Sequence, residues 1–459
     1  MSLTRALAAI VSRPVDGATR ARAALHVVDW LGCAHAGAVE PAGLLLRADA
    51  GVEGDGPATV IAGKRRGEAA AAFANGGLGN VLEMDDVHKQ AILHPGPVTI
   101  AAALATAEAE GASGAQFLDA VVAGYEAVIR VGRSLGPAHY AKWHNTASAG
   151  PFGAAAACGR LLGLDDEAMV SALGNAGTQV SGPWQCRHEP VMTKQLHTAR
   201  AAHAGLKAAR LAALGFTGPA YILEGPQGLY AATAPDCVPE RVTADPDGPF
   251  LITQTSIKPW PACRHAHAAI DAALLVRPRV DAPVAAITIR TYDDALAFCD
   301  RPTPDTVIGA KFSLQHAVAA TLVDGPPPLS QFSLEAIGRS DIAHLRSLCH
   351  VERDEAFASA YPARYGTGLT VALKDGRVLT ADVPDALGDP ENPLPEAMLL
   401  EKAHALLRHA GVDQGAAEDL VDAALALTDS PHLTALSAAL QKAGQSIAER
   451  PTAGVPNAA

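Results

Sequence analysis

Apolar side chains recur every three or four residues along much of the first half of the chain, which is the spacing of one face of an α-helix. The segment RARAALHVVDWL, residues 20–31, is typical of this pattern. Gly and Pro interrupt it, and Asp165 with Asp166 mark a helix start, where acidic groups meet the positive end of the helix dipole. The predicted helices are 20–31, 101–109, 115–135, 165–173 and 195–214.

The pattern changes after about Gly248. Residues 285–292 alternate apolar and polar positions, which predicts a half-buried strand. A later pair of short apolar runs flanks an Asp-Gly dipeptide, which favours a β-hairpin. The hairpin strands are 369–373 and 378–383, and the further predicted helices are 312–322, 399–408, 415–427 and 433–443, before a frayed end.

These patterns predict a mainly α protein with an α+β part. A large all-helical domain takes residues 1–257 and is completed by residues 395–459. A smaller α+β domain of residues 258–394 is inserted between those two segments. A chain of 459 residues is long enough for such a division.

Composition excludes several classes of protein. The net charge is −12 and no basic run occurs, which argues against nucleic acid as a partner, although a local pocket can still attract an anionic small molecule. A hydrophobic content of 49% excludes general disorder. The most apolar stretch, 147–164, is broken by Pro151 and Arg160, so no membrane span is expected. No secretory signal is expected at the N-terminus, and seven scattered cysteines without a CxxC motif indicate reduced thiols and a cytoplasmic location.

The densest group of ionisable residues is Glu83, Asp85, Asp86, His88 and His94. Neighbouring carboxylates and imidazoles shift one another's pKa values, which is the situation that acid–base catalysis uses. The alternatives are a solvated polar helix end and a divalent metal site, although no paired-cysteine or HExxH spacing supports a metal.

Two further segments place basic groups beside small residues. His144 precedes a helix rich in Ala, Gly and Ser, where a ligand can approach the backbone closely; the alternative is a capping or packing histidine. Lys194 and His197 are three residues apart, so they share one helix face. Burial and the positive helix end would favour the neutral, basic form of Lys194; the alternative is a lysine that extends to solvent.

The segment KPWPACRHAH, residues 258–267, is held extended by two prolines. Arg264 is suited to bind a carboxylate through two parallel hydrogen bonds, and Cys263 is a candidate acid, base or packing thiol. A last segment, KFSLQH, ends at His316 and alone would be a polar helix cap. No GxGxxG in a βαβ context, Walker A or GxSxG motif occurs, so nucleotide binding and an elbow-type serine hydrolase have no support.

In this order the five segments resemble the MmgE/PrpD family, which includes 2-methylcitrate dehydratase, cis-aconitate decarboxylase and iminodisuccinate epimerase. The likeness runs from the first helices to about residues 392–402. The resemblance implies a helical domain built from both termini, an inserted α+β domain, an active site in the cleft between them, a homodimer, and no metal or organic cofactor.

Residue by residue, four positions match residues that line the pocket of the decarboxylase-like members: His94, His144, Lys194 and Lys258. Four others depart from that pattern. Glu83 stands where Asp is usual, Val87 where Thr is found, Cys263 where the decarboxylase has His, and His316 where Tyr is found.

The resulting hypothesis is a cofactor-independent lyase. Lys194 or His144 would remove a proton α to a carboxylate of a small di- or tricarboxylate, such as a 2-methylcitrate-like hydroxy acid, and His94, His316 or Cys263 would protonate the leaving hydroxyl. The catalytic candidates are His94, His144, Lys194, Lys258, Cys263 and His316, and the substrate-binding candidates are Glu83, Asp85, Asp86, His197, Arg264 and His267.

Three alternatives remain open from the sequence. An epimerase of the iminodisuccinate type would use the same carbanion-like intermediate, a non-catalytic binding protein would retain only the fold, and a hydratase would depend on a metal. The catalytic hypotheses require Lys194 and Lys258 to meet in one crevice, because both cations would stabilise the same carbanion.

Overall fold

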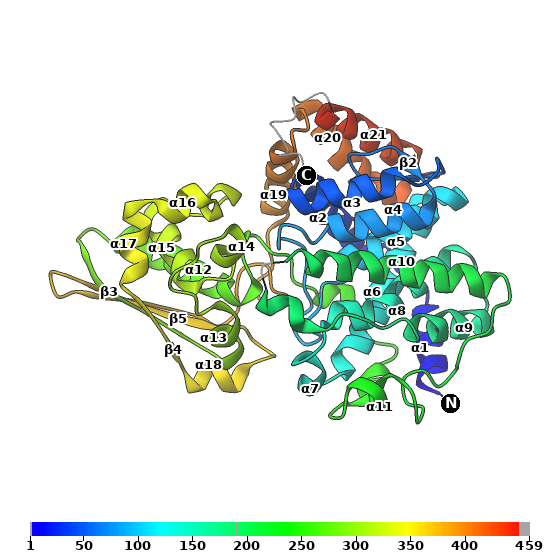
Figure 1. Cartoon of the computed structure of the whole chain (residues 1–459), viewed down its shortest axis with the longest axis horizontal. Helices are drawn as coiled ribbons and strands as arrows, with labels where there is room; N and C mark the ends of the chain where they lie inside the picture. The colour runs from blue at the N-terminus through cyan, green and yellow to red at the C-terminus, as the bar shows by residue number, and fades with distance from the viewer. Residues whose placement is uncertain (1, 190, 449–459) are drawn as a thin grey trace. The chain divides into compact units, whose positions relative to one another are not determined.

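The computed structural model describes residues 2–189 and 191–448, which form two compact units (Figure 1). Unit 1 combines the chain up to Thr255 with the chain from Glu396 onward, and unit 2 is Ser256–Pro395. The sequence-based domain limits, 257 and 394, lie two residues and one residue from these boundaries. The predicted frayed end falls on residues 449–459, outside the described residues.

Unit 1 is helical apart from a two-residue antiparallel ladder between β1 (Ala58–Thr59) and β2 (Arg65–Arg66). All the helices predicted in its sequence are present. The α-helices of unit 1 are α1 (Leu3–Val11), α2 (Gly17–Ala38), α3 (Pro41–Gly51), α4 (Glu68–Leu78), α5 (Pro95–Glu110), α6 (Gly114–Ser134), α7 (Pro137–Tyr140), α8 (Asn145–Leu161), α9 (Asp166–Gly177), α10 (Thr193–Ala213), α11 (Leu229–Thr233), α19 (Glu396–Ala410), α20 (Gln414–Leu425) and α21 (Thr434–Ala448).

Small residues allow α5, α8 and α10 to pack closely at the centre of unit 1. A Cβ atom added to Gly150 of α8 would lie 2.8 Å from Ala201 Cβ of α10 and 3.2 Å from Val98 Cγ1 of α5. Both distances are at or below the limit of ordinary contact, so only glycine fits at this crossing. The Ala-rich composition thus produces a core in which the three helices contact one another through small residues.

Unit 2 contains a four-stranded sheet in the order β4-β3-β5-β6. The strands are β3 (Val284–Thr291), β4 (Cys349–Arg353), β5 (Thr367–Leu373) and β6 (Val378–Val383). β3 pairs parallel with β4 and antiparallel with β5, and β5 and β6 form the hairpin that the Asp-Gly dipeptide predicts.

Helices complete unit 2. α12 (His267–Val276) packs on β5 and β6, α15 (Leu314–Asp324) packs on α12 and β4, and their apolar faces share one core with the sheet. Alternation along β3 buries Ile287 and Ile289, as the sequence predicts for a half-buried strand. The other α-helices of unit 2 are α13 (Asp293–Cys299), α14 (Val307–Lys311), α16 (Leu334–Gly338), α17 (Ser340–Ser347) and α18 (Glu355–Ala360).

No helix among residues 2–189 and 191–448 is long and apolar enough to cross a membrane. All seven cysteines are free thiols.

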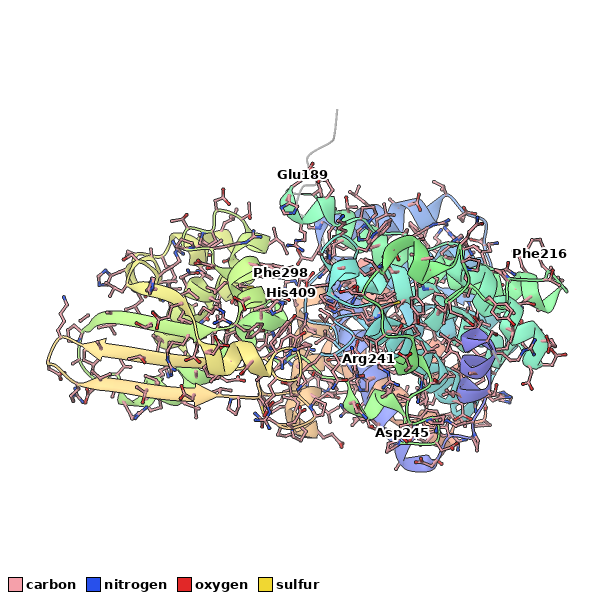
Figure 2. The ribbon with its side chains drawn as sticks, turned by 90° about the horizontal axis from the view of Figure 1, so that it is seen from below. Glu189, Phe216, Arg241, Asp245, Phe298 and His409 are labelled. Atoms are coloured by element: carbon pink, nitrogen blue, oxygen red, sulfur yellow. The ribbon has the colours of Figure 1, made fainter. Side chains whose placement is uncertain are left out.

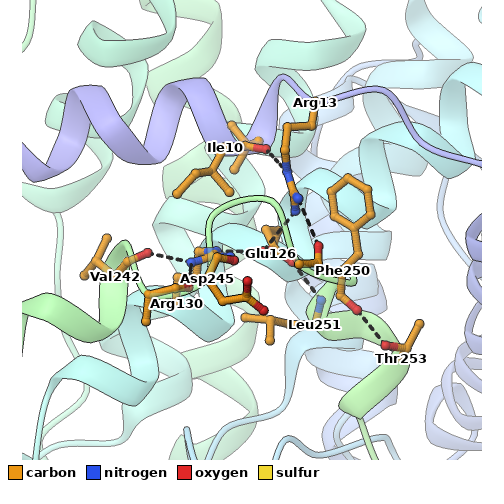
Figure 3. A network of polar contacts seen from close by, with 12 residues as sticks. Ile10, Arg13, Glu126, Arg130, Val242, Asp245, Phe250, Leu251 and Thr253 are labelled. Carbon is orange, nitrogen blue, oxygen red and sulfur yellow. Dashed lines mark hydrogen bonds and ion pairs between the residues drawn. The ribbon is translucent and has the colours of Figure 1, made fainter.

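A buried ion pair fixes the segment that leads from the helices of unit 1 to its boundary at Thr255 (Figure 3). Arg130 Nε donates to Glu126 Oε1 at 2.6 Å, and the Arg130 guanidinium also donates to the carbonyls of Val242 and Asp245 at 2.9 and 3.0 Å. The second carboxylate oxygen of Glu126 accepts from Leu251 N at 2.8 Å. Asp245 itself lies at the surface, where Figure 2 labels it, so the pair ties an exposed loop to the core.

We expect Arg130→Met to destabilise unit 1 by about 3–5 kcal/mol, because it leaves the Glu126 carboxylate buried without its cation. Urea unfolding measures the change. Arg5→Met is the control, because Arg5 forms its ion pair with Glu167 at the surface and its loss should leave the unfolding midpoint unchanged. Equal effects of the two substitutions would contradict this role for the buried pair.

Candidate active site

Three helices begin at one place in unit 1. His94 is the N-cap residue of α5, His144 is the N-cap residue of α8, and His197 lies in the first turns of α10. The rings of His94 and His144 are 6.4 Å apart, and those of His144 and His197 are 5.4 Å apart. The close packing at Gly150 brings these helix starts together. Their dipoles favour a negative charge at this position.

His144 and His197 form a buried imidazole pair. Their Nδ1 atoms are 3.2 Å apart, so one ring donates a hydrogen bond to the other. Trp184 covers His144, with the ring centroids 4.4 Å apart. Gly182, with φ at +97°, lets the chain pass beside both rings and accepts a hydrogen bond from His144 N at its carbonyl.

Burial keeps both of these imidazoles neutral. It lowers the pKa of His144 well below the ordinary value, and the positive charge of Lys194 lowers it further. Burial and Lys194 also lower the pKa of His197 to about 4. At neutral pH the pair is therefore uncharged, and it presents one hydrogen-bond acceptor nitrogen and one N–H donor.

His94 differs because a carboxylate holds it. Its Nδ1 lies 3.0 Å from Asp85 Oδ2 and 3.0 Å from the carbonyl oxygen of Asp86, so Nδ1 carries the proton and donates. Asn80 Nδ2 donates to the same Asp85 oxygen at 2.7 Å, and Thr146 Oγ1 accepts from His94 N at 3.0 Å. This arrangement leaves Nε2 as the reactive nitrogen, and Asp85 stabilises the imidazolium when Nε2 takes a proton.

Lys194 lies at the start of α10 and forms an ion pair with Glu83. Its side chain is 19% exposed, whereas that of Glu83 is 2% exposed, so the ammonium lies at the accessible edge of the cluster. Glu83 has φ at +59°, a left-handed conformation that is strained for a residue other than glycine. A paired carboxylate stabilises the charged ammonium, so the geometry favours Lys194 as a cation over Lys194 as the general base.

Asp86 is occupied inside unit 1. Its Oδ2 accepts from Tyr125 Oη at 2.6 Å and lies 2.8 Å from His26 Nδ1, while its Oδ1 accepts from Gly96 N at 2.9 Å. These contacts join residues 79–94 to α2, α5 and α6. Asp86 therefore holds the segment that carries Glu83, Asp85 and His94 rather than presenting a carboxylate to a substrate.

The sequence-predicted residues of unit 2 occupy its interior. Lys258 and Cys263 are 1% and 7% exposed, and His267 Nε2 lies 3.0 Å from the carbonyl oxygen of Ala262. Arg264 forms an ion pair with Asp389. His316 has a partner at each ring nitrogen: Nε2 lies 2.8 Å from the carbonyl oxygen of Gln331, and Nδ1 lies 3.2 Å from Arg346 Nη1.

These contacts reduce the suitability of Arg264 and His316 for catalysis. An arginine already paired with an internal carboxylate is a poorer carboxylate clamp, and an imidazole with both nitrogens engaged is a poorer proton donor. Arg264 and His316 are therefore more suited to stabilising unit 2.

The metal alternative finds no geometric support at the acidic segment. Within residues 2–189 and 191–448, three potential metal ligands approach one another within 4.8 Å only at Asp385, Asp389 and Glu391 in unit 2. Asp389 is already paired with Arg264 there, and a cation beside that guanidinium would be repelled.

Sequence reasoning missed several residues that shape the cluster, namely Asn80, Thr146, Trp184, His26, Tyr125 and Lys402. One signal was available. His26 and Asp29 are polar residues three positions apart in the apolar pattern of 20–31, which indicates a buried polar contact. The others depend on helix packing and have no local signal.

Comparison with known proteins identifies the relatives of this chain. Residues 2–241 match the MmgE/PrpD N-terminal domain and residues 260–427 match the MmgE/PrpD C-terminal domain. The chain belongs to the MmgE/PrpD family. The family resemblance of the sequence motifs is thereby confirmed.

The similar proteins compared with this chain are named cis-aconitate decarboxylase or cis-aconitate decarboxylase-like protein. Cis-aconitate decarboxylase from Aspergillus terreus is 27% identical over 437 residues, 88% of each chain. Cis-aconitate decarboxylase from Mus musculus is 28% identical over 362 residues, 73% of this chain and 71% of the mouse protein. Cis-aconitate decarboxylase-like protein oryM from Aspergillus oryzae is 30% identical over 315 residues, 62% of this chain and 65% of its own length.

The neutral imidazoles make the stability of unit 1 depend on pH. Because the pKa of His197 is about 4 in the folded protein and about 6.5 when unfolded, the unfolded chain binds more protons between these values. The contribution of His197 to stability is therefore fully present above about pH 6.5 and is lost as the pH falls toward 4.

We expect His197→Gln to lose less thermal stability than the wild type between about pH 7 and about pH 5. Melting temperatures at the two pH values measure this. His350→Gln is the control, because the side chain of His350 is 74% exposed. If His197→Gln has the same pH dependence of the melting temperature as the wild type, His197 takes up protons equally in the folded and the unfolded protein, which contradicts the prediction.

Proposed function

We propose that this chain is a cofactor-independent lyase that acts on a small tricarboxylate, and that the basic cluster at the starts of α5, α8 and α10 performs its acid–base chemistry. The observation that carries the proposal is the meeting of His94, His144, Lys194 and His197, which are far apart in sequence, at three positive helix ends. Membership of the MmgE/PrpD family and the names of the relatives support it.

The charges suit a polycarboxylate. The Lys194 ammonium and the three helix starts attract negative charge, and the neutral His144–His197 pair supplies an N–H that can donate to a carboxylate oxygen. The same groups stabilise the negative charge that develops on a carbanion next to a carboxylate.

His94 is the proton carrier in this proposal. Decarboxylation of cis-aconitate breaks a C–C bond, releases CO2 and leaves the electron pair on a carbon that a remaining carboxylate stabilises; the His94 imidazolium then protonates that carbon from Nε2. In a dehydration, neutral His94 removes the proton α to the carboxylate at Nε2, and the imidazolium so formed gives that proton to the departing hydroxide, which leaves as water. The Asp85 contact at Nδ1 supports both directions of transfer.

The names of the relatives favour decarboxylation of cis-aconitate as the first reaction to test, with dehydration of a 2-methylcitrate-like hydroxy acid as the second. Epimerisation has no support among these relatives. The non-catalytic alternative accounts poorly for a cationic lysine and a carboxylate-held histidine at one accessible edge, because such groups are costly to maintain without use.

In unit 2, Lys258 stays a predicted substrate cation because it matches a pocket-lining position of the family, and Cys263 and His267 near it in sequence stay predictions as well. Arg264 and His316, which have partners within unit 2, are not assigned catalytic steps. The shared crevice of Lys194 and Lys258, the homodimer and the cytoplasmic location stay predictions.

The test is a substrate screen with the full-length protein. CO2 release from cis-aconitate detects decarboxylation, and the ultraviolet absorbance of a new conjugated alkene from citrate or 2-methylcitrate detects dehydration. We expect turnover in either the decarboxylation assay or the dehydration assay, at a rate that EDTA does not change. No turnover of any tricarboxylate, or turnover that EDTA abolishes, would overturn the proposal.

Two substitutions locate the chemistry. We expect His94→Gln to lower kcat by about 10²- to 10⁴-fold, because the proton carrier is lost. Asp85→Asn should lower kcat less, because the His94 ring keeps Nε2 but loses the carboxylate that orients it. His350→Gln, an exposed histidine of unit 2, is the matched control and should retain wild-type kcat.

A further inference from the structure

Lys402 of α19 reaches into the interior of unit 1. Its side chain is 5% exposed, and Nζ donates to Asp29 Oδ1 of α2 at 2.5 Å and to the carbonyl oxygen of Met84 at 2.7 Å. Helices α2 and α19 lie side by side (Figure 1), and the bond to Met84 joins the lysine to the segment between α4 and α5. No step of the proposed reaction uses this ammonium.

Met84 stands between the two carboxylates that hold the basic groups of the cluster. Glu83 pairs with Lys194 on one side, and Asp85 binds His94 on the other. The Met84 carbonyl belongs to the peptide that joins Met84 to Asp85, so the Lys402 hydrogen bond fixes the plane of that peptide and with it the direction of the Asp85 side chain.

Little regular structure holds this segment otherwise. Residues 79–94 connect α4 to α5 and contain one isolated bridge, between His88 and Leu93. A loop of this length depends on side-chain contacts for its order, and Lys402 supplies one from a helix more than 300 residues later in the chain.

Asp29 explains how the ammonium is tolerated there. Burial raises the pKa of Asp29 to about 6, while the charge of Lys402 opposes that rise, so the two groups balance each other's charge. A buried pair of this kind is often replaceable by neutral residues without loss of stability. Neutral residues in place of Asp29 and Lys402 would also leave no unpaired buried charge, so charge balance alone does not explain the lysine. The hydrogen bond to the Met84 carbonyl, in contrast, needs the Lys402 ammonium.

We propose that Lys402 is a positioning residue: through the Met84 carbonyl it fixes the segment that aims Glu83 at Lys194 and Asp85 at His94. The effect on catalysis rests on the proposed function, whereas the effect on the order of residues 79–94 does not. The two consequences are therefore measured separately.

The test separates positioning from charge balance with three variants. Lys402→Met removes the bond to Met84 and leaves Asp29 buried without a cation. Asp29→Asn/Lys402→Met removes both charges and still lacks the bond to Met84. Asp29→Asn retains Lys402 and its bond, and Lys442→Met is the matched control, because Lys442 pairs with Asp419 at the surface.

Hydrogen–deuterium exchange of a peptide covering residues 79–94 and the melting temperature are measured for each variant. In Asp29→Asn/Lys402→Met we expect a melting temperature above that of Lys402→Met, yet exchange about tenfold faster than wild type in this peptide. Asp29→Asn and Lys442→Met should exchange at the wild-type rate. Wild-type exchange in the double variant would overturn the proposal, and so would equally fast exchange in Asp29→Asn.

Kinetics give the second readout on whichever tricarboxylate the wild type turns over. We expect kcat of the double variant to fall by about 10- to 100-fold with a smaller change in KM, because misplacement of the proton carrier affects the chemical step more than binding. Recovery of kcat together with the melting temperature would overturn the positioning role. If the wild type turns over no tricarboxylate, the proposed function fails, and the exchange measurement alone decides the role of Lys402.

Discussion

The close approach of α5, α8 and α10 at Gly150 is the constraint on which the candidate active site depends. A side chain at this crossing would separate the three helices, and the helix starts that carry His94, His144 and His197 would no longer meet. The site is therefore a consequence of small-residue packing in the core of unit 1. The scarcity of aromatic residues and the abundance of alanine in the sequence are consistent with this packing of small side chains.

The candidate active site also requires that its buried charges are paired, and each acidic residue has a different partner. Asp86 anchors its segment to three helices, Asp85 holds His94, and Glu83 holds Lys194. The imidazoles without a carboxylate, His144 and His197, have lowered pKa values and remain neutral. One histidine is thus equipped to carry a proton, while its neighbours are equipped to bind.

Local patterns predicted the helices and strands well, because the spacing of apolar residues that marks a helix or a strand lies within a short segment of the chain. The pairing of Lys194 and His197 on one helix face followed from their spacing of three, and the β5–β6 hairpin followed from its Asp-Gly turn. Contacts between distant segments had no such signal. The His144–His197 contact depends on helix packing, the Arg264–Asp389 pair joins positions 125 residues apart, and Lys402 meets Met84 across 318 residues. Family motifs pointed to these segments but not to the contacts that each side chain makes in the folded protein.

The most direct test of acid–base catalysis at His94 is the turnover of cis-aconitate in ²H₂O by EDTA-treated protein, followed by NMR of the product. Release of CO2 with one solvent deuterium on the product carbon that a remaining carboxylate stabilises, in the wild type and not in His94→Gln, is the predicted result. CO2 release at the wild-type rate by His94→Gln would contradict it, because the proton would then come from another group.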